Sequence, residues 1–177
     1  SDFFGFYDES ERKGRSQIAF YYSTHFHNFI VSNYPEFNQV PEVIRFFEAC
    51  RDIQQAYGKL FDETAAEIGL TQTLSILFKV IKYLPEYLAT KPHYDGTAFS
   101  LFLDSTDNQS LLLTSYKYSF TVDDFSSPLR EFSRSENQNT ILLIPGTLLT
   151  EFSIYPTPHI VKASGNVRYA TIAFAMR

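Results

Sequence analysis

The spacing of apolar residues changes once along the chain, from a helical repeat to a strand repeat. Between residues 41 and 68 the mainly apolar positions recur every three or four residues: Val43, Phe46, Phe47, Cys50, Ile53, Tyr57, Leu60, Phe61, Thr64 and Ile68. Pro41 suits the first turn of a helix, and Gly69 follows the last periodic residue. The pattern therefore predicts one long amphipathic helix over 41–68.

After Gly69 the repeat shortens towards two, which is typical of strands. Turn-forming residues such as Pro145-Gly146 separate the apolar runs. The predicted strands cover residues 76–83, 97–104, 110–122, 140–144, 147–153, 158–163 and 167–176. The polar, serine-rich stretch 123–139 is predicted to be a loop or a short helical insert. Many short strands separated by turns favour a β-sandwich or barrel.

Residues 1–39 are rich in aromatic side chains, and the apolar run 18–22 predicts an early strand or an irregular segment. We expect one compact structural unit with two parts, an N-terminal segment over 1–70 and a β core over 71–177. The abrupt start at Ser1 is what a chain trimmed from a longer protein would show.

Composition excludes some classes of function. The net charge is -5 and no basic run occurs, so we expect no nucleic-acid partner and no anionic membrane. No apolar stretch approaches the ~20 residues of a membrane-spanning helix, and the start lacks the pattern of a signal peptide. We expect a cytoplasmic protein. Cys50 is the single cysteine, which excludes an internal disulfide and, in the helical pattern, predicts a small buried side chain.

Four polar residues interrupt the apolar strands: His93, Asp95, His159 and Arg168. His93 and Asp95 are two residues apart and would share one strand face. Extending the same alternation places them on the face of Phe99. Similar alternation around His159 and Arg168 predicts that all four side chains point into the core.

Two imidazoles and one carboxylate form the ligand set of mononuclear iron sites, which leave positions open for O2 and substrate. Zinc accepts the same ligands. Arg168 argues against zinc, because a guanidinium pairs with the carboxylate of a bound dicarboxylate through two parallel hydrogen bonds. The simpler alternative is that Arg168 reaches a strand end and pairs with a surface acid such as Glu151.

Two further pairs of residues carry weaker signals. His25 and His27 would share a strand face, but no third ligand has a suitable spacing, so we interpret them as packing or pocket-lining residues. Lys79 and Tyr83 share a face of the strand before the histidine motif, and both could face the interior.

The segment KPHYDGTAFSLFL, residues 91–103, resembles the His-x-Asp strand of the non-haem iron and 2-oxoglutarate-dependent dioxygenases, in the branch that includes isopenicillin N synthase and the plant dioxygenases. Residues 140–168, with Ile144-Pro145-Gly146 and Pro158-His159, are similar to the second-histidine region of that branch. The resemblance extends over residues 76–177 and more weakly over 40–70.

This resemblance implies a mainly β fold with α-helices, a double-stranded β-helix or jelly roll with a long N-terminal helix packed against it. It implies that His93, Asp95 and His159 bind Fe(II) as the catalytic centre. It also implies that Arg168 and Tyr83 bind 2-oxoglutarate. The implied activity is the oxidation of an organic small molecule with O2 by hydroxylation, desaturation or cyclisation.

The chain departs from the family pattern at three positions. Ile81 stands where asparagine is usual, Ala170 where serine is usual, and Ile160 where arginine is usual. One alternative is therefore an iron oxidase that uses the same triad without 2-oxoglutarate. A second is a non-catalytic jelly-roll binding protein. Neither the substrate nor the oligomeric state follows from the sequence.

Overall fold

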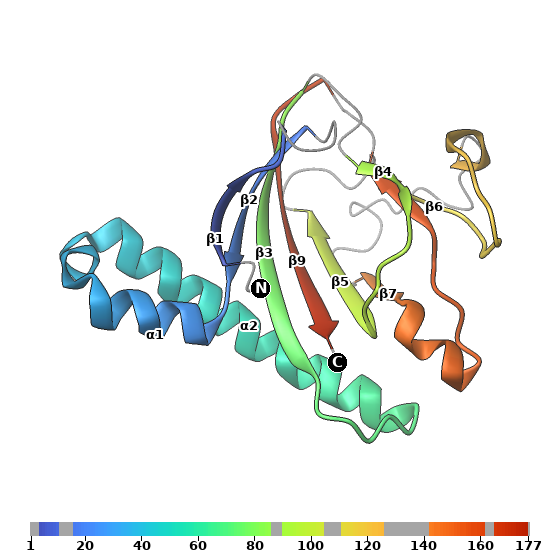
Figure 1. Ribbon diagram of the computed structural model, residues 1–177, viewed down its shortest axis with the longest axis horizontal. Helices are drawn as coiled ribbons and strands as arrows, with labels where there is room; N and C mark the ends of the chain where they lie inside the picture. The colour runs from blue at the N-terminus through green and yellow to red at the C-terminus, as the bar shows by residue number, and fades with distance from the viewer. Residues whose placement is uncertain are drawn as a thin grey trace.

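Two antiparallel β-sheets face each other, with helices outside them (Figure 1). The computed structural model describes residues 4–10, 16–85, 90–104, 111–125, 142–161 and 165–176. The strands are β1 (Gly5–Asp8), β2 (Gln17–Tyr22), β3 (Ser75–Tyr83), β4 (Thr90–His93), β5 (Phe99–Asp104), β6 (Leu111–Leu113), β7 (Leu142–Pro145), β8 (His159–Val161) and β9 (Arg168–Met176). The helices are α1 (Thr24–Asn33), α2 (Pro41–Glu67) and the short 3-10 helices η1 (Pro35–Gln39), η2 (Val122–Phe125) and η3 (Thr147–Phe152).

The larger sheet has the strand order β1-β2-β3-β9-β5-β7, and the smaller sheet has the order β4-β8-β6. Every pairing is antiparallel. Strand β9 lies between β3 and β5, so it joins segments that are far apart in the sequence (Figure 1). The arrangement is mainly β with a few helices, as the sequence predicted.

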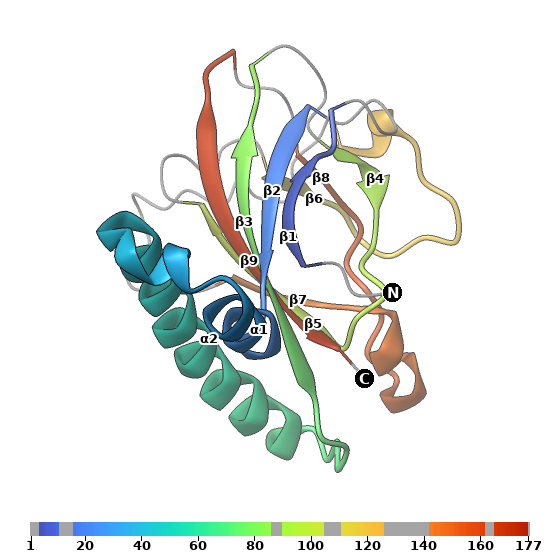
Figure 2. The same ribbon diagram turned by 60° about the vertical axis from the view of Figure 1, so that its left-hand side comes forward.

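Helix α2 covers the outer face of the larger sheet (Figure 2). It ends within one residue of the range predicted from the apolar spacing, and Gly69 follows it with a φ of +77°. Its buried residues are Phe47, Cys50, Tyr57, Phe61 and Ala65. Ala173 and Ala175 of β9 have short side chains on this face, which lets the helix approach the sheet. Phe61 stacks on Phe99 with ring centroids 6.1 Å apart.

Burial of Cys50 is confirmed, and it raises the pKa of the thiol to about 12. A charged thiolate would lose its hydration in this apolar cluster. Cys50 therefore acts as a small packing residue of the helix–sheet interface.

The inner faces of the two sheets form a second apolar cluster. It includes Ile81 and Tyr83 of β3, Phe102 of β5, Ile144 of β7 and Val161 of β8. Because strand residues alternate between faces, β9 contributes Ala170 and Ile172 to this interior while Ala173 and Ala175 face α2. Apolar side chains of both sheets therefore line the interior between them.

Two of the predicted strands were wrong in part. The predicted strand 147–153 is the helix η3, because the backbone N–H groups of Thr147 and Leu148 donate to the carbonyls of Asp95 and Thr97 instead of entering a ladder. The predicted strand 110–122 is a strand only over Leu111–Leu113. Of the predicted loop 123–139, residues 126–139 lie outside the described part of the chain.

Helix α1 replaces the strand face on which we placed His25 and His27. Ser23 caps this helix, since its Oγ accepts a hydrogen bond of 3.1 Å from the backbone N–H of Phe26. Residues two apart on a helix point about 200° apart, so the two imidazoles share no face. The sequence interpretation also did not identify strand β1, and it treated His93 of β4 as part of one strand with the residues of β5.

Candidate metal centre

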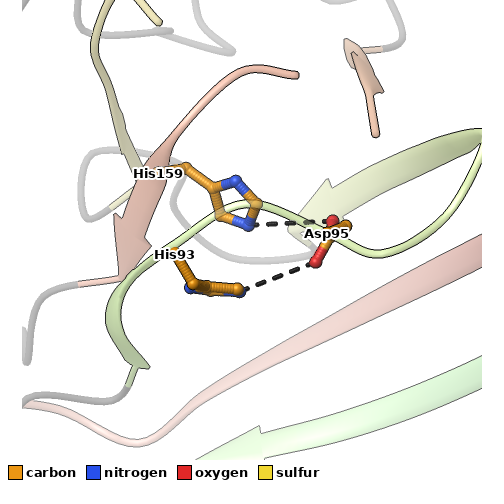
Figure 3. Close-up of side chains that lie close together, drawn as sticks. All are labelled: His93, Asp95 and His159. Atoms are coloured by element: carbon orange, nitrogen blue, oxygen red, sulfur yellow. Dashed lines mark ion pairs between the residues drawn. The ribbon is translucent and has the colours of Figure 1, made fainter. Parts of the chain in front are cut away.

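His93, Asp95 and His159 converge where β4 pairs with β8 (Figure 3). His93 ends β4 and lies opposite His159, the first residue of β8, while Asp95 follows in the connection to β5. Their candidate ligand atoms all lie within 4.8 Å of one another. Nε2 of His93 lies 3.6 Å from Oδ1 of Asp95, and Nε2 of His159 lies 3.8 Å from Oδ2. Two metal–ligand bonds of about 2.0–2.2 Å can span such separations.

Backbone carbonyls fix the orientation of both imidazoles. Nδ1 of His93 lies 2.7 Å from the carbonyl oxygen of Lys91, and Nδ1 of His159 lies 3.1 Å from that of Thr157. A carbonyl can only accept, so each Nδ1 carries the proton and donates it. In a neutral imidazole this tautomer leaves a lone pair on Nε2, the atom of each ring that lies near the Asp95 carboxylate.

Ser100 holds the carboxylate of Asp95. Its Oγ donates to Oδ2 over 2.5 Å and lies 3.1 Å from Oγ1 of Thr97, and Ser100 is buried. The sequence interpretation missed this residue. The available signal was a serine at the second position of the strand FSLFLD, between the apolar residues Phe99 and Leu101.

The loop that carries Asp95 is fixed by the corner between β7 and η3. Besides the bonds from Thr147 and Leu148, the N–H of Gly146 donates to the carbonyl of Ala98 over 2.9 Å. A Cβ on Gly146 would lie 2.1 Å from the carbonyl oxygen of Thr97. Glycine is required here because two backbone segments meet, and the position of the loop that carries Asp95 depends on that contact.

One part of the inward-facing prediction was wrong. Continuous alternation from Asp95 would place Phe99 in the same interior, but Phe99 packs on the α2 side. Residues 94–98 form an irregular connection that reverses the alternation, so Ser100 and Phe102 of β5 face the interior instead. The predicted inward position of Asp95 is nevertheless correct.

The three side chains open into a cavity of about 590 Å³ between the sheets. Its apolar wall includes Leu77, Ile81, Phe102, Ile144, Phe174 and Met176. Tyr83 also lines it, and the guanidinium carbon of Arg168 lies 5.0 Å from the centre of the Tyr83 ring. Arg168 is buried, on the same face of β9 as Ala170. Four of the predicted residues therefore line one cavity: His93, Asp95, His159 and Tyr83. The fifth, Arg168, lies against Tyr83.

Of the second histidine pair, only His27 has a packing role among the residues that the structure describes. His27 stacks on Phe47 with ring centroids 4.6 Å apart, and its Nδ1 lies 3.1 Å from the hydroxyl of Tyr22. Burial, reinforced by Arg51, lowers the pKa of His27. His25 is exposed, and neither residue lines the cavity between the sheets.

Among the described residues, no helix combines the length and apolar character needed to cross a membrane.

No protein-family model matches the sequence, and no curated protein matches it. Comparison with solved structures is informative. The dioxygenase for auxin oxidation 1 from Arabidopsis thaliana, in a binary complex with 2-oxoglutarate, matches with a TM-score of 0.66 at 18% identity, over 99% of this chain and 69% of that one. The rice dioxygenase for auxin oxidation matches with a TM-score of 0.66 at 11% identity, over 99% of this chain and 60% of that one.

The fold is that of the 2-oxoglutarate- and iron-dependent oxygenases. A third structure with this fold, JOX2 in complex with 2OG, Fe and JA, matches with a TM-score of 0.51 at 14% identity. That match covers 92% of this chain and 50% of JOX2. The chain thus spans between half and about two thirds of the length of these oxygenases.

Proposed function

We propose that this protein is an Fe(II)-dependent oxygenase that uses 2-oxoglutarate and O2 to oxidise an organic small molecule. The observation that carries the proposal is the convergence of His93, Asp95 and His159 on an apolar cavity within an oxygenase fold. We further propose that the two sheets form the jelly roll of that superfamily.

The donor set fits iron. Two neutral imidazole nitrogens and one carboxylate occupy one side of a metal and leave the other side open, as in the non-haem iron oxygenases. His93, Asp95 and His159 would hold the ion, and Ser100 would keep the carboxylate oriented. When bound, iron with 2-oxoglutarate would activate O2 and supply the oxidising equivalent. The protein itself would fix the positions of the ligands and surround the oxidant with an apolar wall that excludes water.

Arg168 and Tyr83 are the proposed residues for 2-oxoglutarate. A guanidinium offers paired donors to a carboxylate, and the Tyr83 ring holds it in place through a cation–π contact. The buried position of Arg168 on the inner face of β9 agrees with this role.

A second candidate function has a specific observation in its favour. Ile81 and Ala170, which replace the polar residues of the family pattern, are direct partners across β3 and β9, and both are 1% exposed. The wall beside Tyr83 is therefore apolar at two adjacent positions. Losing one hydrogen bond would weaken co-substrate binding by about 1 kcal/mol. An iron oxidase that works without 2-oxoglutarate is the alternative.

Anaerobic addition of Fe(II) and then 2-oxoglutarate tests the proposal. We expect a metal-to-ligand absorption band that requires both additions, disappears in His93→Ala, and weakens in Arg168→Gln. His25→Ala is the matched control, because this exposed histidine lies outside the cavity and should leave the band unchanged. Iron binding without any band, together with O2 uptake that releases no succinate, would favour the oxidase. No metal binding would leave the non-catalytic binding protein.

A further inference from the structure

A buried ion pair lies in the wall of the cavity on strands that the metal centre does not use. Nζ of Lys79, on β3, lies 3.3 Å from Oε1 of Glu9, which follows β1. Their side chains are 7% and 15% exposed. Both residues line the cavity, as do Gln17 and Tyr21 of β2. Strands β1, β2 and β3 form one edge of the larger sheet (Figure 2).

Glu9 is held by donors from two strands. The hydroxyl of Tyr21 donates to Oε1 over 2.7 Å, and the side-chain amide of Gln17 donates to Oε2. Burial raises the pKa of Glu9, but Lys79, Tyr21 and Gln17 outweigh burial and lower the pKa below its ordinary value. The Lys79 ammonium also lies 5.0 Å from the centre of the Tyr21 ring. The carboxylate is therefore charged at neutral pH and fixed in position.

Packing alone gives no reason to keep this pair. Lys79 shares its strand face with Leu77 and Ile81, so an aliphatic residue would fit the same surface. A buried ion pair is often no more stabilising than well-packed apolar residues of similar volume. Charged groups that line a cavity in an otherwise apolar wall are instead typical of ligand recognition.

Resting on the proposed oxygenase function, we propose that Glu9 and Lys79, with Gln17 and Tyr21, bind a neutral hydrogen-bonding group of the substrate, such as a hydroxyl or a carboxamide. The charges of Glu9 and Lys79 oppose each other, so this ion pair offers both a donor and an acceptor and carries no net charge itself. An anionic or cationic substrate group would have to compete with the ion pair. The remaining wall is apolar, which selects a largely hydrocarbon or aromatic body.

The strand register sets the reach of such a substrate. Lys79 pairs with Ile172, which pairs with Phe102, and Ser100 lies one same-face step from Phe102 on β5. With strands about 4.8 Å apart and a same-face step of about 6.8 Å, the Cα atoms of Lys79 and Ser100 are about 12 Å apart. The cavity thus accommodates a molecule whose polar end and oxidised carbon lie on opposite sides of an apolar body.

Three probes that share one planar skeleton test the proposal: cinnamyl alcohol, cinnamate and cinnamylamine. They differ only in a terminal hydroxyl, carboxylate or ammonium group. Their affinities are measured by calorimetry with the metal-free protein, so the result does not depend on iron or 2-oxoglutarate. We expect the alcohol to bind at least tenfold more tightly than either charged probe.

The main variant is the double substitution Glu9→Gln with Lys79→Met, which removes both charges of the ion pair together and should stay folded. It should weaken binding of the alcohol at least tenfold, whereas Lys82→Met, on the other face of β3, should not. The single variants Glu9→Gln and Lys79→Met, where they fold, give a second measurement of the affinity for the alcohol. Tightest binding by cinnamate, dependent on Lys79 alone, would overturn the proposal. Equal affinities in the double variant and the parent, or no binding by any probe at millimolar concentration, would overturn it too.

An absent absorption band with intact probe selectivity would refute the oxygenase function and leave the recognition site standing. A normal band with unselective probes would refute only the recognition site. The two proposals therefore fail separately.

Discussion

Removing the Ser100 hydroxyl should weaken metal binding without removing a metal ligand. Its Oγ donates to Asp95 Oδ2 over 2.5 Å, and Ser100 is 1% exposed, so Ser100→Ala removes a buried donor from the Asp95 carboxylate. A hydrogen bond to a charged group contributes about 1.5–3 kcal/mol. At 1.4 kcal/mol per factor of ten, that corresponds to a loss of about tenfold to a hundredfold. Outer partners of metal ligands typically have effects of about this size.

Anaerobic Fe(II) titration by calorimetry measures the effect, with Co(II) as a redox-stable repeat. Ser75→Ala is the matched control, because this serine is exposed at the start of β3. Near-ultraviolet circular dichroism establishes that Ser100→Ala is folded. Unchanged affinity for Fe(II) in Ser100→Ala would refute a role of this hydrogen bond in metal binding. Unchanged affinity in Asp95→Ala as well would refute Asp95 as a metal ligand.

Gly146→Ala should destabilise the protein by about 1–3 kcal/mol or more, because its Cβ would meet the Thr97 carbonyl oxygen at 2.1 Å; thermal unfolding measures this. Phe61→Ala should lower the free energy of unfolding by about 3–5 kcal/mol in urea titrations, since Phe61 is 1% exposed under α2. Glu9 should contribute a pH-dependent stability. Because its folded pKa is lowered, that contribution is present above the ordinary glutamate pKa of about 4.3 and is lost as pH falls through the folded value. The difference in Tm between the parent and Glu9→Gln should therefore shrink in that range.

Each of these outcomes has a control. An unchanged Tm in Gly146→Ala would contradict the backbone contact with Thr97. Phe46→Ala should cost less than Phe61→Ala, because Phe46 is 38% exposed; equal losses would argue against burial as the cause. Glu42→Gln, at an exposed surface pair, should show no comparable pH dependence. A Glu9 effect that grows as pH falls would contradict the lowered pKa.

Local patterns predicted the parts of the fold whose signals are themselves local. The helix α2 followed from apolar spacing over many turns, and the end at Gly69 followed from its conformational freedom. Strands β3 and β9 are long, and their apolar runs predicted them over 76–83 and 167–176. The grouping of His93 and Asp95 with His159 followed from strand alternation, from ligand chemistry and from the family resemblance. Their roles as metal ligands remain predictions.

The missed features depend on contacts between distant segments. The residues of η3 have the composition of a strand, but the backbone of the Asp95 loop takes their N–H groups. The reversal of alternation before Phe99 arises in an irregular connection that no period describes. Glu9 and Lys79 are 70 residues apart, so no sequence motif could pair them. Helix α1 is short and aromatic, and only the Ser23 cap marked its start.

The stability of the smaller sheet would depend more directly on a bound metal than that of the larger sheet. Its strands β4, β6 and β8 have four, three and three residues, and helix α2 packs on the other sheet. Two of the proposed metal ligands sit on this sheet, and the third belongs to the loop that ties it to β7. Metal binding would therefore add stabilising free energy mainly to this sheet of short strands. The amide protons of β4 and β8 would report metal occupancy by slower hydrogen exchange through local opening. Those of β3 and β9 would slow only through global unfolding, which metal binding also opposes.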